Sequence, residues 1–256
     1  MGQVISITNQ KGGVGKTTTA INLSAFLANE GCKILLIDLD PQGNTTSGLG
    51  LERAEIKSSL YEVLLNEIHP QEATHKTPYK NLSLIPSTVV LAAAEVELVA
   101  HLAREYKLKQ AIAKIVNEYD FIFIDSPPSL GLLTVNGLVA SDKILIPVQA
   151  EYYALEGLGQ LLHTVQRVKV SLNPKIDLLG VLLTMYDKRT VLSRQVEEET
   201  KKHFPGKVFE TIVPRNIRLA EAPSFGKSIF SYDFLGKGAS AYKNLAKEVK
   251  VKCKMT

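Results

Sequence analysis

The chain has 256 residues, a formal net charge of +4 and two distant cysteines, Cys32 and Cys253. Apolar residues make up 45% and charged residues 22%, which argues against wholesale disorder, and no apolar run approaches the ~20 residues that span a bilayer. Two separated cysteines exclude a disulfide framework and a four-thiolate metal site, and they suit a reducing cytoplasm. The length predicts one domain over residues 1–256.

Positive charge gathers in the C-terminal part of the chain. Residues 1–150 carry 12 Lys/Arg against 15 Asp/Glu, whereas residues 151–256 carry 18 against 11. Such an asymmetry suggests a polyanion or an acidic surface as the partner of the C-terminal part, and a solvated basic face is the alternative.

Short apolar runs alternate with longer amphipathic stretches along the whole length. Runs such as residues 34–37 and 121–124 are continuously apolar, which is typical of strands buried on both faces of a parallel sheet. The alternation predicts an α/β fold with a doubly wound, mostly parallel sheet flanked by helices. The expected strands are 4–8, 33–38, 82–86, 121–125, 143–148, 178–184 and 208–213. The expected helices are 17–29, 94–117 with a break near Tyr106, 130–140, 156–171, 191–204 and 239–250.

The first strand runs into a glycine-rich loop that opens the first helix. Residues 9–18 read Asn-Gln-Lys-Gly-Gly-Val-Gly-Lys-Thr-Thr. In this context the glycines let backbone N–H groups close around phosphates, Lys16 reaches the β- and γ-phosphates, and the Thr17 hydroxyl ligates magnesium. A glycine-rich turn that binds no nucleotide is the alternative. The expected nucleotide-binding residues of this P-loop are Lys11, Gly12, Gly13, Val14, Gly15, Lys16, Thr17 and Thr18.

Acidic side chains follow two of the apolar strands. Asp38 and Asp40 come at the end of the second, and Asp125 ends the fourth. The carboxyl ends of parallel strands meet at the ligand-binding edge of such a sheet, although a lone aspartate there is often a turn residue. We expect Asp125 to position magnesium, Asp38 to support the metal site together with Thr17, and Asp40 to orient the attacking water. Lys11, Lys16 and Asp40 are the expected catalytic residues.

Five blocks carry a resemblance to a known family: the P-loop with its early Lys11, residues 38–44 (Asp-Leu-Asp-Pro-Gln-Gly-Asn), residues 125–131, residues 149–158 and residues 214–224. The P-loop is of the deviant Walker A type, and the chain resembles the ParA/Soj partition ATPases over nearly its whole length. The resemblance implies an Mg²⁺-dependent ATPase with weak basal turnover. It also implies an ATP-dependent homodimer that binds double-stranded DNA without sequence preference and is released when a ParB-type partner stimulates hydrolysis.

The resemblance also implies roles for individual residues. Lys11 reaches the phosphates held by the opposite subunit, and Glu151 contacts nucleotide across the dimer. Met185, Pro214 and Arg215 lie in the loops beside the adenine. A cytoplasmic, nucleoid-associated protein is expected.

The expected DNA surface is basic. The resemblance points to Arg189 and Arg218, and charge placement adds Arg194, Lys227, Lys243 and Lys247. For each of them an exposed solubilising charge is the alternative. No helix-turn-helix precedes the P-loop, so the expected binding is non-specific.

Three rival functions share parts of this pattern. A MinD-like membrane-cycling ATPase would need a C-terminal amphipathic helix, but residues 241–254 offer only a thin apolar stripe, and no membrane partner is expected. An iron–sulfur relative would need bridging cysteines near its dimer interface. A non-enzymatic adaptor would not need Lys16, Thr17, Asp40 and Asp125 together.

Overall fold

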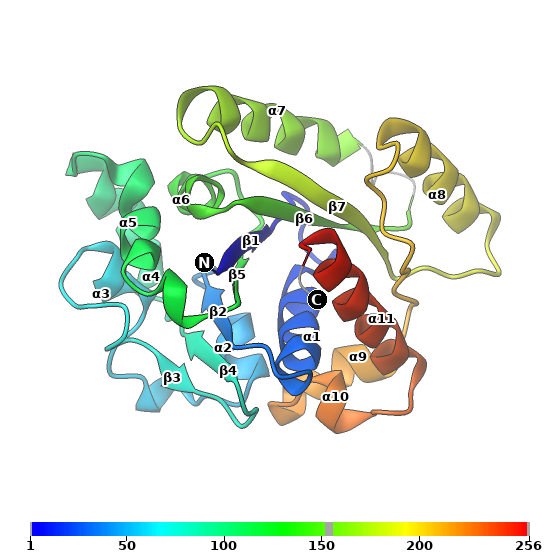
Figure 1. The fold of residues 1–256 in the computed structure, drawn as a ribbon, viewed down its shortest axis with the longest axis horizontal. Coiled ribbons are helices and arrows are strands. Elements are labelled where there is room, and N and C mark those ends of the chain that lie inside the picture. Colours follow the sequence, from blue (N-terminus) through cyan, green and yellow to red (C-terminus); the bar gives the residue numbers. More distant parts are fainter. Residues whose placement is uncertain (1, 152–155, 255–256) are drawn as a thin grey trace.

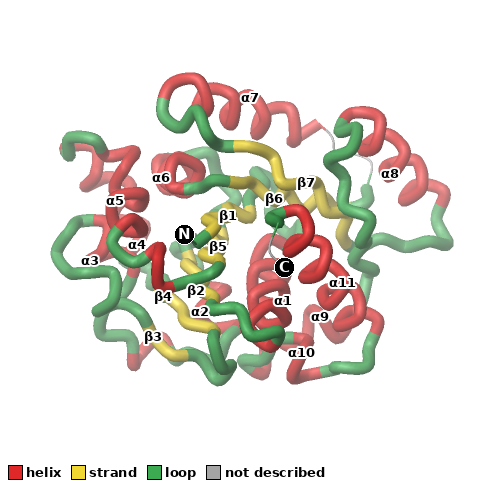
Figure 2. Tube along the Cα trace, viewed as in Figure 1, coloured by secondary structure: helices red, strands yellow, loops and turns green. Residues whose placement is uncertain are grey.

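The computed structural model describes residues 2–151 and 156–254, and their strands form one seven-stranded sheet in the order β3-β4-β2-β5-β1-β6-β7 (Figures 1 and 2). The β3–β4 pair is antiparallel and the other neighbouring pairs are parallel, which confirms the predicted mostly parallel sheet. The strands are β1 (Gln3–Ile7), β2 (Ile34–Asp38), β3 (His75–Lys76), β4 (Leu82–Ile85), β5 (Phe121–Asp125), β6 (Lys143–Gln149) and β7 (Asp177–Thr184).

Helices cover both faces of this sheet (Figure 1). One face buries α1 and α11 against alternate residues of β1, β2 and β5, and the other buries α3 to α6 and, over β6 and β7, α7 and α8. Burial on both faces explains why these strands are continuously apolar. The helices are α1 (Lys16–Asn29), α2 (Asn44–Gly48), α3 (Leu60–Leu64), α4 (Leu91–Glu97), α5 (Lys107–Ala113), α6 (Leu132–Ala140), α7 (Glu156–Ser171), α8 (Val191–His203), α9 (Ile217–Glu221), α10 (Ile229–Tyr232) and α11 (Lys237–Lys252).

The expected strand at residues 208–213 is wrong. This segment runs beside β7 and makes an isolated bridge between Val181 and Val208. Its middle turns away because the backbone N–H groups of Glu210 and Thr211 donate to the Glu248 carboxylate on α11, at 2.9 and 3.1 Å. A side chain from another element therefore takes the donors that a ladder would have used.

The expected helix at residues 94–117 is broken near Tyr106 as predicted, but the break is longer than expected and the helical parts are shorter. α4 ends at Glu97, α5 begins at Lys107, and Ala103 between them has a positive φ of 53°. The buried Asn136 of α6 holds this break, because its amide donates to the Arg104 carbonyl at 2.9 Å and its Oδ1 accepts from the Leu108 N–H at 3.1 Å.

None of the helices in the described residues is long and apolar enough to cross a membrane. The expected motif at residues 149–158 is described only in part, since residues 152–155 lie outside the described ranges.

Candidate nucleotide site and basic surface

The P-loop joins β1 to α1 and is open on the side where a phosphate would bind. Gly13 and Gly15 have φ values of 73° and 88°, a backbone region that other residues rarely adopt. A Cβ at Gly12 or Gly13 would meet no heavy atom within 4 Å. The loop is fastened from behind by Thr184, which donates to the Val14 carbonyl at 2.8 Å. The fold therefore presents backbone N–H groups and a helix N-terminus to an open space, as an anion site requires.

The two lysines of the loop have different positions. Lys16 is 7% exposed, and its Nζ donates to the Lys11 carbonyl at 3.0 Å, inside the loop. Burial lowers the pKa of Lys16, and the Asp125 and Asp40 carboxylates oppose that shift. The Lys11 ammonium instead lies outside the loop, where it pairs with Glu151. Lys16 thus lies inside the P-loop, whereas Lys11 lies at its edge beside Glu151, the residue that was expected to contact nucleotide.

The strand register places two expected metal-site carboxylates side by side. Asp38 of β2 is directly opposite Asp125 of β5, and both are buried. Asp125 Oδ2 accepts from the hydroxyls of Thr17 and Thr45, both at 2.7 Å. Its other oxygen, Oδ1, is buried and has no hydrogen-bond partner among the described residues. Burial raises the pKa of Asp125 to about 6, against the two threonine hydrogen bonds.

This donor set fits magnesium. Mg²⁺ prefers oxygen ligands and usually keeps several waters around one or two carboxylates. Asp125 Oδ1 is an unmatched buried acceptor next to the Thr17 hydroxyl at the start of α1. A bound cation would reverse the effect of burial on this carboxylate and hold it ionised.

Asp38 points to the loop after β2. Its Oδ2 accepts from the Thr46 N–H at 2.8 Å and from the Thr46 hydroxyl at 2.7 Å. The Thr46 hydroxyl in turn accepts from the Ser87 N–H at 3.0 Å. Burial, reinforced by the charge of Asp125, raises the pKa of Asp38 to about 7. Through these contacts Asp38 fixes the loop that carries Asp40. Asp40 is itself 8% exposed and accepts from the Gln42 N–H at 2.9 Å.

Four polar residues of this network were not predicted. Thr45 and Thr46 follow the motif at 38–44 directly, so a hydroxyl pair beside two strand-end aspartates was an available signal. Ser87 and Thr184 had no such signal, because only the fold brings them to the site.

The expected adenine-side residues come together. Met185 follows β7 with a positive φ of 50°, and the next residue, Tyr186, forms a parallel bridge with Pro214. The Arg215 N–H donates to the Tyr186 carbonyl at 3.1 Å. The loop after β7 and the loop of Pro214 and Arg215 are therefore held next to each other. Both lie close to Thr184 at the end of β7, which contacts the P-loop.

The expected DNA residues lie in several separate places. Arg189 lines a cavity of about 900 Å³, together with Arg215 of the adenine-side loop and with Lys188 and Lys237, which were not predicted. Lys227 lines a different cavity. The remaining candidates stand on separate helices: Arg218 on α9, Arg194 at an exposed position of α8, and Lys243 and Lys247 at exposed positions of α11.

Two of these arginines are already paired within the chain. Arg189 donates to Asp187 through Nε at 2.9 Å and Nη2 at 2.7 Å, and these hydrogen bonds lower the pKa of Asp187 to about 2. Arg218 donates to Glu221 at 3.0 Å and lies over the Tyr232 ring.

Comparisons with known proteins identify the family. A family model described as an AAA domain matches residues 2–178. The sporulation initiation inhibitor protein Soj of Bacillus subtilis is 55% identical, covering 97% of this chain and 98% of that protein. The chain belongs to the Soj/ParA family of partitioning ATPases. Other members include the chromosome partitioning protein ParA of Myxococcus xanthus (53% identical, covering 97% and 88%) and the chromosome-partitioning ATPase Soj of Treponema pallidum (50%, covering 97% and 97%).

Solved structures share the fold of this Soj/ParA chain. A cobyrinic acid a,c-diamide synthase of Mycobacterium smegmatis, solved with ADP and magnesium, has a TM-score of 0.85 at 39% identity, covering 96% of this chain and 93% of that one. A plasmid partition protein of Borrelia burgdorferi bound to AMPPNP has a TM-score of 0.83 at 27% identity, covering 99% and 100%. The MinD cell division ATPase of Pyrococcus furiosus has a TM-score of 0.78 at 26% identity, covering 98% and 99%. Because these names differ, the fold alone does not choose the function. The partition relatives, at higher identity, show the family to which the chain belongs.

Proposed function

We propose that this chain is an ATP-driven DNA-partitioning switch in which the ATP-bound homodimer binds duplex DNA and hydrolysis releases it. The observation that carries the proposal is the separation of the two P-loop lysines. Lys16 occupies the interior of the loop, whereas the Lys11 ammonium stands outside it on Glu151. A lysine in that place is available to the phosphates of a second copy, much as an arginine finger is supplied in trans.

The nucleotide site works by positioning. The open N–H groups of the P-loop and the buried Lys16 ammonium hold the β- and γ-phosphates, and Asp40 orients the attacking water. Thr17 and the unmatched Asp125 Oδ1 would hold magnesium, with Asp38 supporting the site through the Thr46 loop. The ion would supply positive charge that offsets the charge developing on the phosphates during transfer.

The remaining expected residues contact the adenine and the nucleotide of the second subunit. The adjoining loops of Met185, Pro214 and Arg215 flank the base. Glu151 exchanges its contact with Lys11 for the nucleotide of the opposite subunit when the dimer forms.

The DNA surface is the basic C-terminal part of the chain. Arg189, Arg194, Arg218, Lys243 and Lys247 are its candidates and all stand at exposed positions, whereas Lys227, which was also expected to bind DNA, lines a separate cavity beside the last turns of α1. Contacts from arginine and lysine to phosphates carry no sequence information, so binding is non-specific and weakens steeply with salt. A ParB-type partner stimulates hydrolysis, and the protein is cytoplasmic and associated with the nucleoid. One domain, residues 1–256, performs the whole cycle.

The test measures light scattering and binding to a random-sequence duplex with no nucleotide, ADP or ATP. The parent chain is expected to dimerise and to bind DNA only with ATP. Lys11→Ala weakens both, Lys16→Ala abolishes both, and Asp40→Ala prolongs the DNA-bound dimer. DNA binding that ignores nucleotide, or its absence despite normal ATP-dependent dimerisation, would contradict the proposal. Binding to liposomes in its place would favour a MinD-like cycle.

A further inference from the structure

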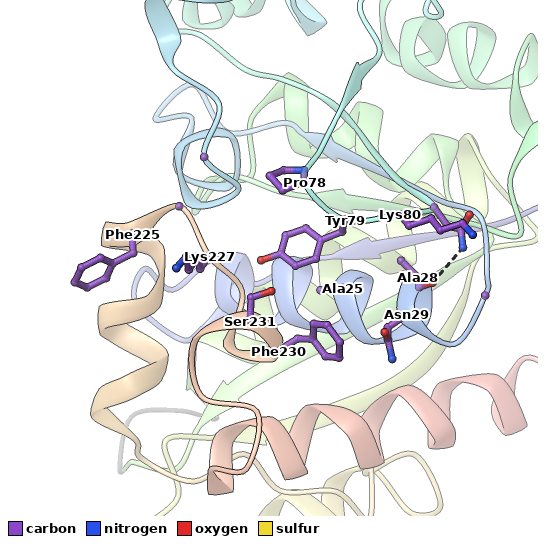
Figure 3. Close-up of a pocket in the computed structure, with 14 residues that line it drawn as sticks. Ala25, Ala28, Asn29, Pro78, Tyr79, Lys80, Phe225, Lys227, Phe230 and Ser231 are labelled. Carbon is purple, nitrogen blue, oxygen red and sulfur yellow. Dashed lines mark hydrogen bonds between the residues drawn. The ribbon is translucent and has the colours of Figure 1, made fainter.

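A second cavity lies at the end of α1 that is remote from the P-loop (Figure 3). It encloses about 730 Å³ between the last turns of α1, the β3–β4 turn and the segment from Phe225 to Ser231. The last turns of α1 form its floor, where Ala25 and Ala28 have only 1% and 2% of their surface exposed. Because α1 begins at Lys16 in the nucleotide loop and ends at Asn29 beside this cavity, the two sites occupy opposite ends of one helix.

Aromatic rings line the cavity. Tyr79 and Phe230 flank the floor on opposite sides of α1, and Phe225 stands at the outer edge with 63% of its surface exposed (Figure 3). Phe230 is held edge-on between Phe26 and Phe234, with ring centroids 5.4 and 5.3 Å apart. Exposed aromatic surface beside a hollow is typical of a binding site for another molecule, since water solvates it poorly.

The walls are fixed by hydrogen bonds from neighbouring elements. The Tyr79 hydroxyl accepts from the Ser228 N–H at 2.7 Å, and the Asn81 amide donates to the Ala28 carbonyl at 3.4 Å. Gly226 approaches Gly50 so closely that a Cβ on Gly226 would lie 2.6 Å from the Gly50 Cα. The cavity is therefore largely preformed, which lowers the conformational entropy lost on binding.

The charge of the cavity has one sign. Lys80 and Lys227 are the charged residues of its lining, and no carboxylate lines it. Neither lysine forms an ion pair within residues 2–151 and 156–254. Arg189 and Arg218 differ, since each is neutralised by a carboxylate of its own segment. A ligand that packs on the apolar lining therefore complements the cavity best if it carries negative charge beside its apolar part, facing the two lysines.

The lining also offers polar groups that suit an extended backbone. Asn29, Asn81 and Ser231 contribute side-chain donors and acceptors, and Gly31 and Gly50 leave main chain uncovered. Peptide recognition commonly combines such contacts with one pocket for a side chain.

We propose that this cavity docks a short acidic segment of a protein partner, with one aromatic or large aliphatic side chain packed against the Tyr79 and Phe230 rings. Acidic residues on either side of that anchor face Lys80 and Lys227. Duplex DNA is the weaker alternative, because it presents phosphates at its surface and keeps its bases stacked inside, so it leaves the aromatic rings of the cavity uncovered. A volume of about 730 Å³ accommodates one such anchor and its flanking residues.

The test selects binders from a random heptapeptide phage library on the immobilised, nucleotide-free chain. Enriched peptides are expected to combine an aromatic or leucine residue with two or more acidic residues. Their affinities, measured by fluorescence anisotropy, are expected to fall at least about tenfold in Lys227→Glu and in Ser231→Trp, which places an indole at the rim of the cavity. Lys109→Glu, an equal charge reversal at an exposed position of α5 on the other face of the sheet, is the matched control and keeps parental affinity.

Circular dichroism and thermal unfolding of each variant separate lost binding from lost folding. The proposal is overturned if no acidic, apolar consensus is enriched, or if Ser231→Trp folds normally and binds within twofold of the parent. It is also overturned if Lys227→Glu weakens duplex DNA binding while leaving peptide affinity unchanged, since Lys227 would then belong to the DNA surface.

Discussion

The carboxylates at the nucleotide site and two arginines of the expected DNA surface, Arg189 and Arg218, are hydrogen-bonded, but in opposite settings. Asp125 is buried and accepts from Thr17 and Thr45, which are 108 and 80 residues away in sequence. The Arg189 side chain is 84% exposed and pairs with Asp187, only two residues away. The Asp125 hydrogen bonds depend on distant segments that meet at the sheet, whereas the Arg189–Asp187 pair lies within one loop.

The difference matters because water screens one kind of contact and not the other. Exposed ion pairs contribute roughly 0–1 kcal/mol, so a DNA phosphate can replace Asp187 with little loss. A buried acceptor left without a donor costs about 1–3 kcal/mol, and more when it is charged. The nucleotide site is thus preorganised, whereas the basic surface exchanges partners readily.

The largest effect is expected for Lys16→Ala. This change removes the buried ammonium that faces Asp125 and Asp40, and we expect turnover to fall by about 100-fold or more because a preorganised charge at the phosphates is lost. Phosphate release measured at saturating ATP checks it, with Lys109→Ala as a control for the loss of a lysine. Turnover within a few-fold of the parent would mean that Lys16 does not face the phosphates.

Thr46→Val tests whether the buried network around Asp38 is needed for the fold. The valine removes the hydroxyl that donates to Asp38 and accepts from the Ser87 N–H, at nearly constant volume. We expect the free energy of unfolding in urea to fall by about 2–4 kcal/mol, because two buried groups lose their partner. Thr46→Ser keeps the hydroxyl and should recover most of that loss. Equal unfolding midpoints for all three chains would refute the role.

Glu248→Ala probes the segment at residues 208–213. Glu248 accepts from the N–H groups of Glu210 and Thr211 in a partly exposed setting, so we expect a loss of about 1 kcal/mol and faster amide exchange at those two residues. Hydrogen exchange followed by NMR measures both effects. The exposed Glu198→Ala on α8 serves as the comparison and should change neither.

The smallest effect is expected for Asp187→Asn. This change frees Arg189 from its local partner, and we expect ATP-dependent affinity for duplex DNA to rise about two- to fivefold at low salt. Glu118→Gln, which changes the net charge equally at a distant exposed residue, separates this local effect from a general one. A rise of the same size in both variants would show that net charge alone is responsible.

The sequence was sufficient to predict the alternation of strands and helices and the P-loop at the start of α1. Both follow from local patterns, because a continuously apolar run is typical of a strand covered on both faces, and glycines between a strand and a helix are typical of a loop that closes on phosphates. It also placed Asp38 and Asp125 at strand ends, but not opposite each other, since that register depends on β2 and β5 being neighbours.

Tertiary structure decided the rest. The turn of residues 210–211 away from β7 depends on Glu248 of α11, and the break before α5 is held by Asn136 of α6. The cavity at the end of α1 is made by segments that are distant in sequence. A local pattern reports the faces that a segment must bury. Which side chain completes its hydrogen bonds, and which surfaces meet across a hollow, is settled only when elements from distant parts of the chain pack together.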